Sequence, residues 1–192
     1  MPVQNQAALL AWQYFEVQLH RKFCVQKGAI LYWHWSANNN FKINMKIRGW
    51  NECLVTYIMA ASSPTFGIPK EVYTQGWAGN GSMINERTYY ELDISLSPNW
   101  GGPLFWLHYS HLGINPHELK DPYADYWIEH VNTVKIHHAY ASANPSGWEN
   151  YSYKCWGLTA SDDPFGYSAH QPMTNDNGTI SPTASIASIP YA

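Results

Sequence analysis

The order of hydrophobic and polar positions predicts helices over much of the chain. Residues 6–25 show a helical pattern, and residues 50–61 carry apolar side chains on nearly every side. A helix that is apolar all round is normally buried. Residues 69–78 and 101–112 predict two shorter helices, each with a proline near its first turn.

The second half of the chain predicts a long helix, a loop and a new helix. The long helix begins near Asp121 and ends at about Ala143, before an Asn-Pro pair that a helix does not tolerate. Residues 146–180 are rich in Gly, Pro, Asp and Asn, and a loop of that length in a compact domain is usually functional. Ser181 as N-cap and Pro182 as first helical residue predict a further helix.

Alternation with period two marks the extended segments. It is clean over residues 41–47 and recurs over residues 88–96, which predicts a strand and a strand pair. We therefore expect an all-α fold, part of a helical barrel, with short β-hairpin excursions. The loops of such a barrel would carry the chemistry.

Composition narrows the class of function. The 192 residues suffice for one ordinary domain, and 16% of them are aromatic. Only 13% are charged, against about 25% in typical soluble domains, which excludes a disordered chain and a coiled coil. The net charge is −3 and no basic cluster exists, so nucleic acid is not an expected partner. These features favour an aromatic-lined site for an uncharged ligand, of which a sugar is the first candidate.

The apolar runs and the cysteines bear on membrane insertion, export and metal or disulfide chemistry. No apolar run reaches the length of a membrane span, and no signal peptide begins this chain. Cys24, Cys53 and Cys155 are odd in number and lack metal-ligand spacing, so we expect free thiols.

Glu52 is the foremost catalytic candidate. It is the only charged residue between Arg48 and Lys70, and the pattern places it in the first turn of the apolar helix beside Trp50. Burial disfavours the charged carboxylate and suits a general acid, whereas a helix N-terminus favours the negative charge. The alternative is a structural glutamate that pairs with Arg48 or with backbone donors.

Two polar motifs have more than one interpretation. Asp162-Asp163-Pro164 fits a hydroxyl-binding pair, a turn before proline, or a cation site. His108 and His111 share a helix face, but no acid is spaced as a third metal ligand. We therefore expect polar walls of a cavity here, with no metal and no cofactor.

Several of the ten tryptophans lie near turns, where flat rings can stack on sugars. Two to four of six are expected to do so: Trp33, Trp35, Trp77, Trp100, Trp148 and Trp156. We expect the substrate to contact Trp35, Trp77, His108, Trp156 and Asp162.

Four blocks of sequence resemble one known family. The first block starts at Trp35 and includes the Arg-Gly-Trp-Asn-Glu run that ends in Glu52. The second is the Gly-Gly-Pro-Leu-Phe-Trp run from Gly101. The third is the Cys-Trp-Gly-Leu-Thr-Ala-Ser-Asp-Asp-Pro run from Cys155, and the fourth is the Asp-Asn-Gly-Thr-Ile-Ser-Pro run from Asp176. Together they resemble the bacterial glucoamylase-like glycoside hydrolases, a family that includes endo-β-1,2-glucanases. The likeness extends from about Leu31 to Ala192.

The resemblance implies an (α/α)6 barrel and a periplasmic or secreted glycoside hydrolase that acts on a β-glucan with inversion. Glu52 matches the family's general acid. The aspartate that serves as base would lie beyond the last block, so residues 1–192 would be a partial catalytic domain, incomplete at both ends. An oligosaccharide or polysaccharide is then the expected partner, and a monomer the expected state. Two alternatives remain: an incomplete protein that only binds glycan, and hydrolysis of α-glucans.

Overall fold

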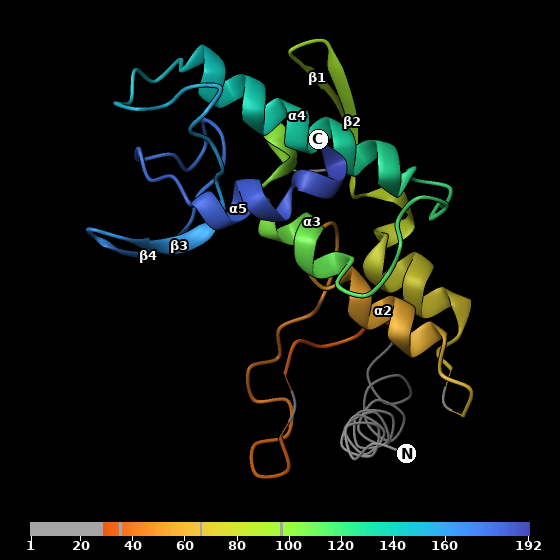
Figure 1. The fold of residues 1–192 in the computed structure, drawn as a ribbon. Helices are drawn as coiled ribbons and strands as arrows, with labels where there is room; N and C mark the ends of the chain where they lie inside the picture. Colours follow the sequence, from red (N-terminus) through yellow and green to blue (C-terminus); the bar gives the residue numbers. More distant parts are fainter. Residues whose placement is uncertain (1–28, 35, 66, 97) are drawn as a thin grey trace, which may run out of the picture. The chain divides into compact units, whose positions relative to one another are not determined.

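The computed structural model describes residues 29–34, 36–65, 67–96 and 98–192. These residues form two units (Figure 1): one holds the described residues up to Gly49 and Cys53–Ser82, and the other holds Trp50–Glu52 and Met83–Ala192. The helix predicted over residues 6–25 lies outside the described residues.

Helix α2 (Leu54–Ala61) organises the first unit, which also contains the π-helix η1 (Val72–Trp77) and the 3-10 turn η2 (Gly79–Gly81). Tyr57 of α2 is fully buried. Its hydroxyl donates to the Ile47 carbonyl at 2.9 Å and accepts from the Leu31 amide at 3.0 Å. One phenol thus anchors two extended segments to the helix.

Two expectations for this unit need correction. The helix predicted from residue 50 begins at Leu54, because Gly49 has a positive φ of 76° and Trp50–Glu52 form a turn. Residues 41–47 form no strand, although Lys46 makes a single bridge to Tyr32. The apolar alternation there does not mark a buried face, since Ile43 and Met45 are 59% and 46% exposed.

Helix α4 (Tyr126–Ala143) is the longest element of the second unit, which also contains α3 (Phe105–Ser110), α5 (Pro182–Ala187) and the 3-10 turns η3 (Asn99–Gly101) and η4 (Ile189–Tyr191). The Asp125 carboxylate caps α4 by accepting from the amides of Trp127 and Ile128. Asn144 ends it in the left-handed conformation, as the Asn-Pro pair predicted. The predicted start near Asp121 is four residues early, because that carboxylate caps the preceding turn instead.

The strand pair predicted over residues 88–96 is confirmed as an antiparallel hairpin of β1 (Ile84–Tyr89) and β2 (Leu92–Leu96), which lies against α4 (Figure 1). The Glu129 carboxylate of α4 accepts the backbone amides of Ser95 and Leu96 at 2.8 and 3.1 Å. Burial raises the pKa of Glu129 to about 7, against the influence of these two amides.

The long loop predicted over residues 146–180 contains a second hairpin, of β3 (Ala160–Asp163) and β4 (Gly166–Ala169). Its strands are polar and short, so apolar alternation gave no signal for them. Helix α5 begins at Pro182 directly after Ser181, which confirms the predicted start.

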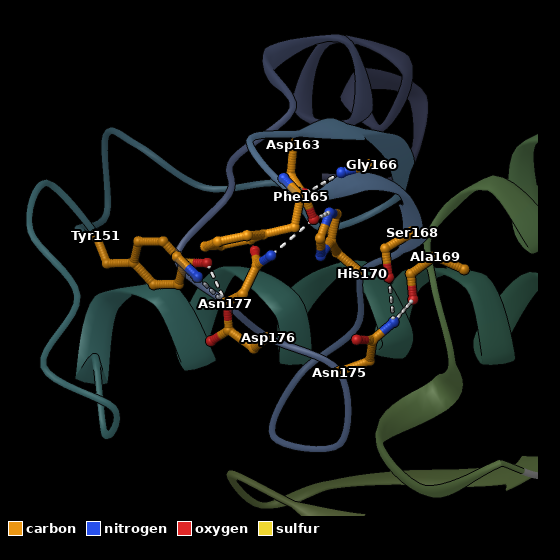
Figure 2. A network of polar contacts seen from close by, with 11 residues as sticks. Tyr151, Asp163, Phe165, Gly166, Ser168, Ala169, His170, Asn175, Asp176 and Asn177 are labelled. Carbon is orange, nitrogen blue, oxygen red and sulfur yellow. Dashed lines mark hydrogen bonds and ion pairs between the residues drawn. The ribbon is translucent and has the colours of Figure 1, made fainter.

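Asp176 ties this loop region to α4. Its Oδ2 accepts from the Tyr140 hydroxyl at 2.6 Å and from Trp148 Nε1 at 3.0 Å. Its Oδ1 accepts from the Tyr151 hydroxyl at 2.6 Å (Figure 2) and from the Gly178 amide at 3.1 Å. Because four donors converge on one carboxylate, this residue is structural.

We expect Asp176→Ala to lower the free energy of unfolding by about 2 kcal/mol, since it leaves the hydroxyls of Tyr140 and Tyr151 without their acceptor. Urea denaturation followed by tryptophan fluorescence measures the change. Asp162→Ala is the matched control, because Asp162 is exposed and makes no hydrogen bond to a described residue. Equal stability of the two variants would contradict the structural role of Asp176.

The described residues are thus mainly helical, with two hairpin excursions of the predicted kind. Among them, no helix has the length and apolar character needed to cross a membrane. Cys53 and Cys155 are free thiols, as expected.

Candidate functional site

Glu52 lies in the turn before α2, and its neighbours in sequence attach that turn to the second unit. The Asn51 carbonyl accepts from Ser110 Oγ of α3 at 2.9 Å. The Trp50 ring lies 5.7 Å from the ring of Tyr126 and 6.1 Å from that of His130, both on α4. The turn that carries Glu52 is thus joined to α3 and α4 through Asn51 and Trp50.

The Glu52 side chain is half-buried, and it makes no hydrogen bond or salt bridge with any residue in the described part of the chain. A bracing glutamate would have such partners. A proton donor instead needs its carboxyl group available to a substrate oxygen, and this geometry leaves it available.

Three histidines gather near the Trp50 ring, and we name them the histidine cluster: His108 of α3, His111 directly after the end of α3, and His130 of α4. The rings of His111 and His130 meet edge to face at 4.1 Å. Tyr191 of η4 covers them, with its ring 5.1 Å from His130 and 6.4 Å from His108. His108 Nε2 also lies 3.1 Å from Ser188 Oγ.

Burial keeps the histidine cluster neutral. Desolvation lowers the pKa of His108 and of His111 to about 4. It lowers the pKa of His130 to about 2, with smaller contributions from the two neighbouring imidazoles. With pKa values this far below 7, all three rings are uncharged at neutral pH.

A neutral imidazole offers one donor and one acceptor. His111 Nδ1 lies 3.2 Å from the Leu107 carbonyl and donates to it, which leaves Nε2 as an acceptor. That Nε2 and both ring nitrogens of His130 are buried without a hydrogen-bond partner.

The predicted binding residues fall in different places. His108 belongs to the histidine cluster, whereas Asp162 is exposed on β3 and Trp156 is half-buried, with its ring 5.4 Å from that of His138. Trp77 has no exposed surface and packs on Tyr57 within the first unit. Trp35 lies outside the described residues. Their contacts with a substrate remain predictions.

Asp163 is engaged by several hydrogen-bond donors. Asp163 Oδ1 accepts the amides of Phe165 and Gly166, and Asn177 Nδ2 donates to Oδ2 at 2.7 Å. These donors, the Phe165 amide above all, hold the pKa of Asp163 below its usual value. Asp163 is therefore a poorer candidate for a catalytic base than a free carboxylate.

A metal centre was one interpretation of the paired histidines. Within the described ranges, no three His, Cys, Asp or Glu side chains come together in a way that could hold an ion. His108 lies in α3 and His111 directly follows it, and their rings meet those of Tyr191 and His130 respectively.

His130 and Tyr191 are site residues that the sequence reasoning did not select. A signal for His130 existed in α4, where the buried side chains Tyr126, His130, Thr133, His137 and Tyr140 recur every three to four residues. Polar and aromatic types at that spacing indicate one buried polar face. For Tyr191 the sequence held no comparable signal.

The family model for Glycoamylase, a family of glucoamylases, matches residues 44–192. The exo-β-1,2-glucooligosaccharide sophorohydrolase of Parabacteroides distasonis is 38% identical over 94% of this chain. The chain spans 27% of that relative's length.

Solved structures agree with this likeness. An endo-β-1,2-glucanase from Chitinophaga pinensis, in a complex with sophorotriose and glucose, is 46% identical with a TM-score of 0.86 over 94% of this chain and 43% of its own. A β-1,2-glucanase from Parabacteroides distasonis is 37% identical with a TM-score of 0.81, and 27% of it is covered. Since the family model covers more than half of the chain, this protein belongs to the Glycoamylase family.

Proposed function

We propose that this chain is part of a glycoside hydrolase that cleaves β-1,2-linked glucans. The observation that carries the proposal is the 46% identity with an endo-β-1,2-glucanase over 94% of the chain. The site is compatible with this chemistry, because Glu52 has no partner among the described residues and follows directly after Trp50 and Asn51, of which Trp50 contacts the uncharged ring of His130.

In the proposed reaction Glu52 is the general acid. Its carboxyl proton passes to the glycosidic oxygen as the bond to the departing sugar breaks. With inversion, a second carboxylate activates a water on the opposite face of the sugar ring, about 6.5–9.5 Å from the first. Asp163 and Asp176 are held by three and four donors, so neither is assigned this role.

His108, the half-buried member of the histidine cluster, would contact a sugar hydroxyl next to the scissile bond. His111 and His130 are buried behind it and would support its ring rather than contact the sugar. The (α/α)6 barrel, a periplasmic or secreted location, and a monomeric state belong to the same proposal. They rest on the family likeness alone.

The test is hydrolysis of β-1,2-glucan, β-1,3-glucan and starch by the protein, measured as reducing ends released. We expect release from β-1,2-glucan at least tenfold faster than from the other two. NMR of the first products should show the anomer opposite to that of the substrate. Faster release from starch would favour the α-glucan alternative, and binding of β-1,2-glucan without any release would favour a glycan-binding protein.

A further inference from the structure

The β3–β4 hairpin presents different side chains on its two faces. In an antiparallel pair, residues opposite each other share a face and successive residues alternate. Asp162 lies opposite Tyr167, and both are exposed. Asp163 and Ser161 are less exposed and belong to the other face. One face therefore carries an acid and a phenol to solvent, while the other attaches the hairpin to the protein.

The attached face is braced by a network of polar contacts around the Asp163–His170 pair (Figure 2). Asp163 Oδ1 accepts the amides of Phe165 and Gly166 at 2.6 and 2.9 Å, which fixes the hairpin turn. Asp163 Oδ2 lies 3.4 Å from Nε2 of the buried His170. Asn175 Nδ2 donates to Ser168 Oγ and to the Ala169 carbonyl at 2.9 and 2.7 Å. The turn is thus held in one conformation before any ligand arrives.

The braced turn holds two aromatic rings in solvent. Phe165 is 90% exposed and Tyr167 is 73% exposed. Single exposed apolar residues are common and need no explanation. Here, however, two rings and the Asp162 carboxylate occupy one short rigid segment that contains no Lys or Arg.

Two exposed aromatic rings beside a carboxylate favour a sugar as the ligand of this hairpin. A pyranose ring has an apolar C–H face that stacks on aromatic rings, and hydroxyl groups at its edge that donate to a carboxylate. An anionic ligand would be repelled by Asp162, and a membrane surface would require basic residues that the hairpin lacks.

We propose that Phe165 and Tyr167 form a stacking platform for a glucose unit of the substrate, with Asp162 accepting a hydrogen bond from one of its hydroxyls. The inference rests on the proposed function and adds two residues to it. The platform acts in binding and takes no part in proton transfer. Preorganisation by Asp163 and Asn175 means that little conformational freedom is lost when the sugar binds.

The experiment compares Phe165→Ala and Tyr167→Ala with the wild type on β-1,2-linked gluco-oligosaccharides, by calorimetric titration and by steady-state kinetics. We expect the dissociation constant and KM to rise about three- to tenfold for each variant, with a smaller change in kcat. Tyr167→Phe, which keeps the ring, should bind like the wild type. Asp162→Asn should weaken binding through loss of the charged acceptor.

Tyr153→Ala is the matched control, because Tyr153 is 63% exposed, lies in the same loop region and has no place in the proposed site. Wild-type hydrolysis with unchanged binding by both alanine variants would overturn the platform and leave the proposed function intact. Loss of a wild-type dimer in Phe165→Ala, with unchanged glucan binding, would assign the face to self-association instead. A wild type that neither binds nor cleaves β-1,2-glucan would remove both proposals together.

Discussion

Replacing Glu52 by glutamine is expected to lower kcat on β-1,2-glucan by about 10²- to 10⁴-fold, because the amide cannot give a proton to the leaving oxygen. KM should change little, since glutamine has the same size and can still hydrogen-bond. The half-buried side chain makes no hydrogen bond or salt bridge within the described part of the chain, so the substitution breaks no structural bond there. Steady-state release of reducing ends measures the effect.

Glu149→Gln is the matched control, because Glu149 is exposed and undergoes the same change of side chain. It should retain the wild-type kcat. A second readout separates chemistry from folding: aryl β-glucosides with good leaving groups need little acid assistance, so any such substrate that the wild type accepts should lose far less rate in Glu52→Gln. A Glu52→Gln enzyme with full activity on β-1,2-glucan would eliminate Glu52 as the acid.

The protein should become markedly less stable as the pH falls from about 6.5 to 4.5. Burial lowers the folded-state pKa of His108, His111 and His137 to about 4 and that of His130 to about 2, against an ordinary value of 6.5. Below pH 6.5 these histidines therefore become protonated in the unfolded chain but stay neutral in the folded chain. The free energy of unfolding falls as a result.

Glu129 works in the opposite direction. Its folded-state pKa of about 7 lies above the ordinary 4.5, so its contribution to stability is greatest below pH 4.5 and is lost as the pH rises through 7. Four histidines outweigh one carboxyl, and we expect a net loss of about 6 kcal/mol between pH 6.5 and 4.5, at about 1.4 kcal/mol per pKa unit and group. Urea denaturation at a series of pH values measures it.

His130→Phe isolates the largest of these effects. Neither nitrogen of His130 has a hydrogen-bond partner, so the variant removes a titrating group without breaking a bond. Relative to the wild type, the variant should gain stability as the pH falls. His34→Phe, at an exposed position, should leave the pH dependence unchanged. Parallel pH profiles of wild type and His130→Phe would show that His130 is not a source of the acid sensitivity.

Local signals predicted the elements that have a strong signature of their own. Ser181-Pro182 predicted the start of α5, the Asn-Pro pair predicted the end of α4, and alternation predicted the β1–β2 hairpin. In each case one or two residues restrict the backbone whatever surrounds them. The β3–β4 hairpin escaped prediction because its strands are polar, and polar alternation does not differ from a loop.

The residues of the candidate site also fall into two groups, those that the sequence alone could indicate and those that only the fold brings together. Glu52 and His108 could be selected from the chain alone, because an isolated acid in an apolar run and two histidines three apart are visible in one dimension. The contacts of His130 with His111 and Tyr191 could not, since these residues are 19 and 61 positions distant along the chain.

The sequence by itself determined the helical character of the chain, its family likeness and the acid that heads the list of catalytic candidates. Only the tertiary structure decided which carboxylates accept hydrogen bonds from other residues and which face solvent. Asp163 and Asp176 look equivalent to Asp162 in the sequence, yet backbone amides and phenols occupy both of them and leave Asp162 in solvent. The reason is physical: a carboxylate's role depends on the donors that folding brings within about 3 Å of it, and those donors come from distant segments.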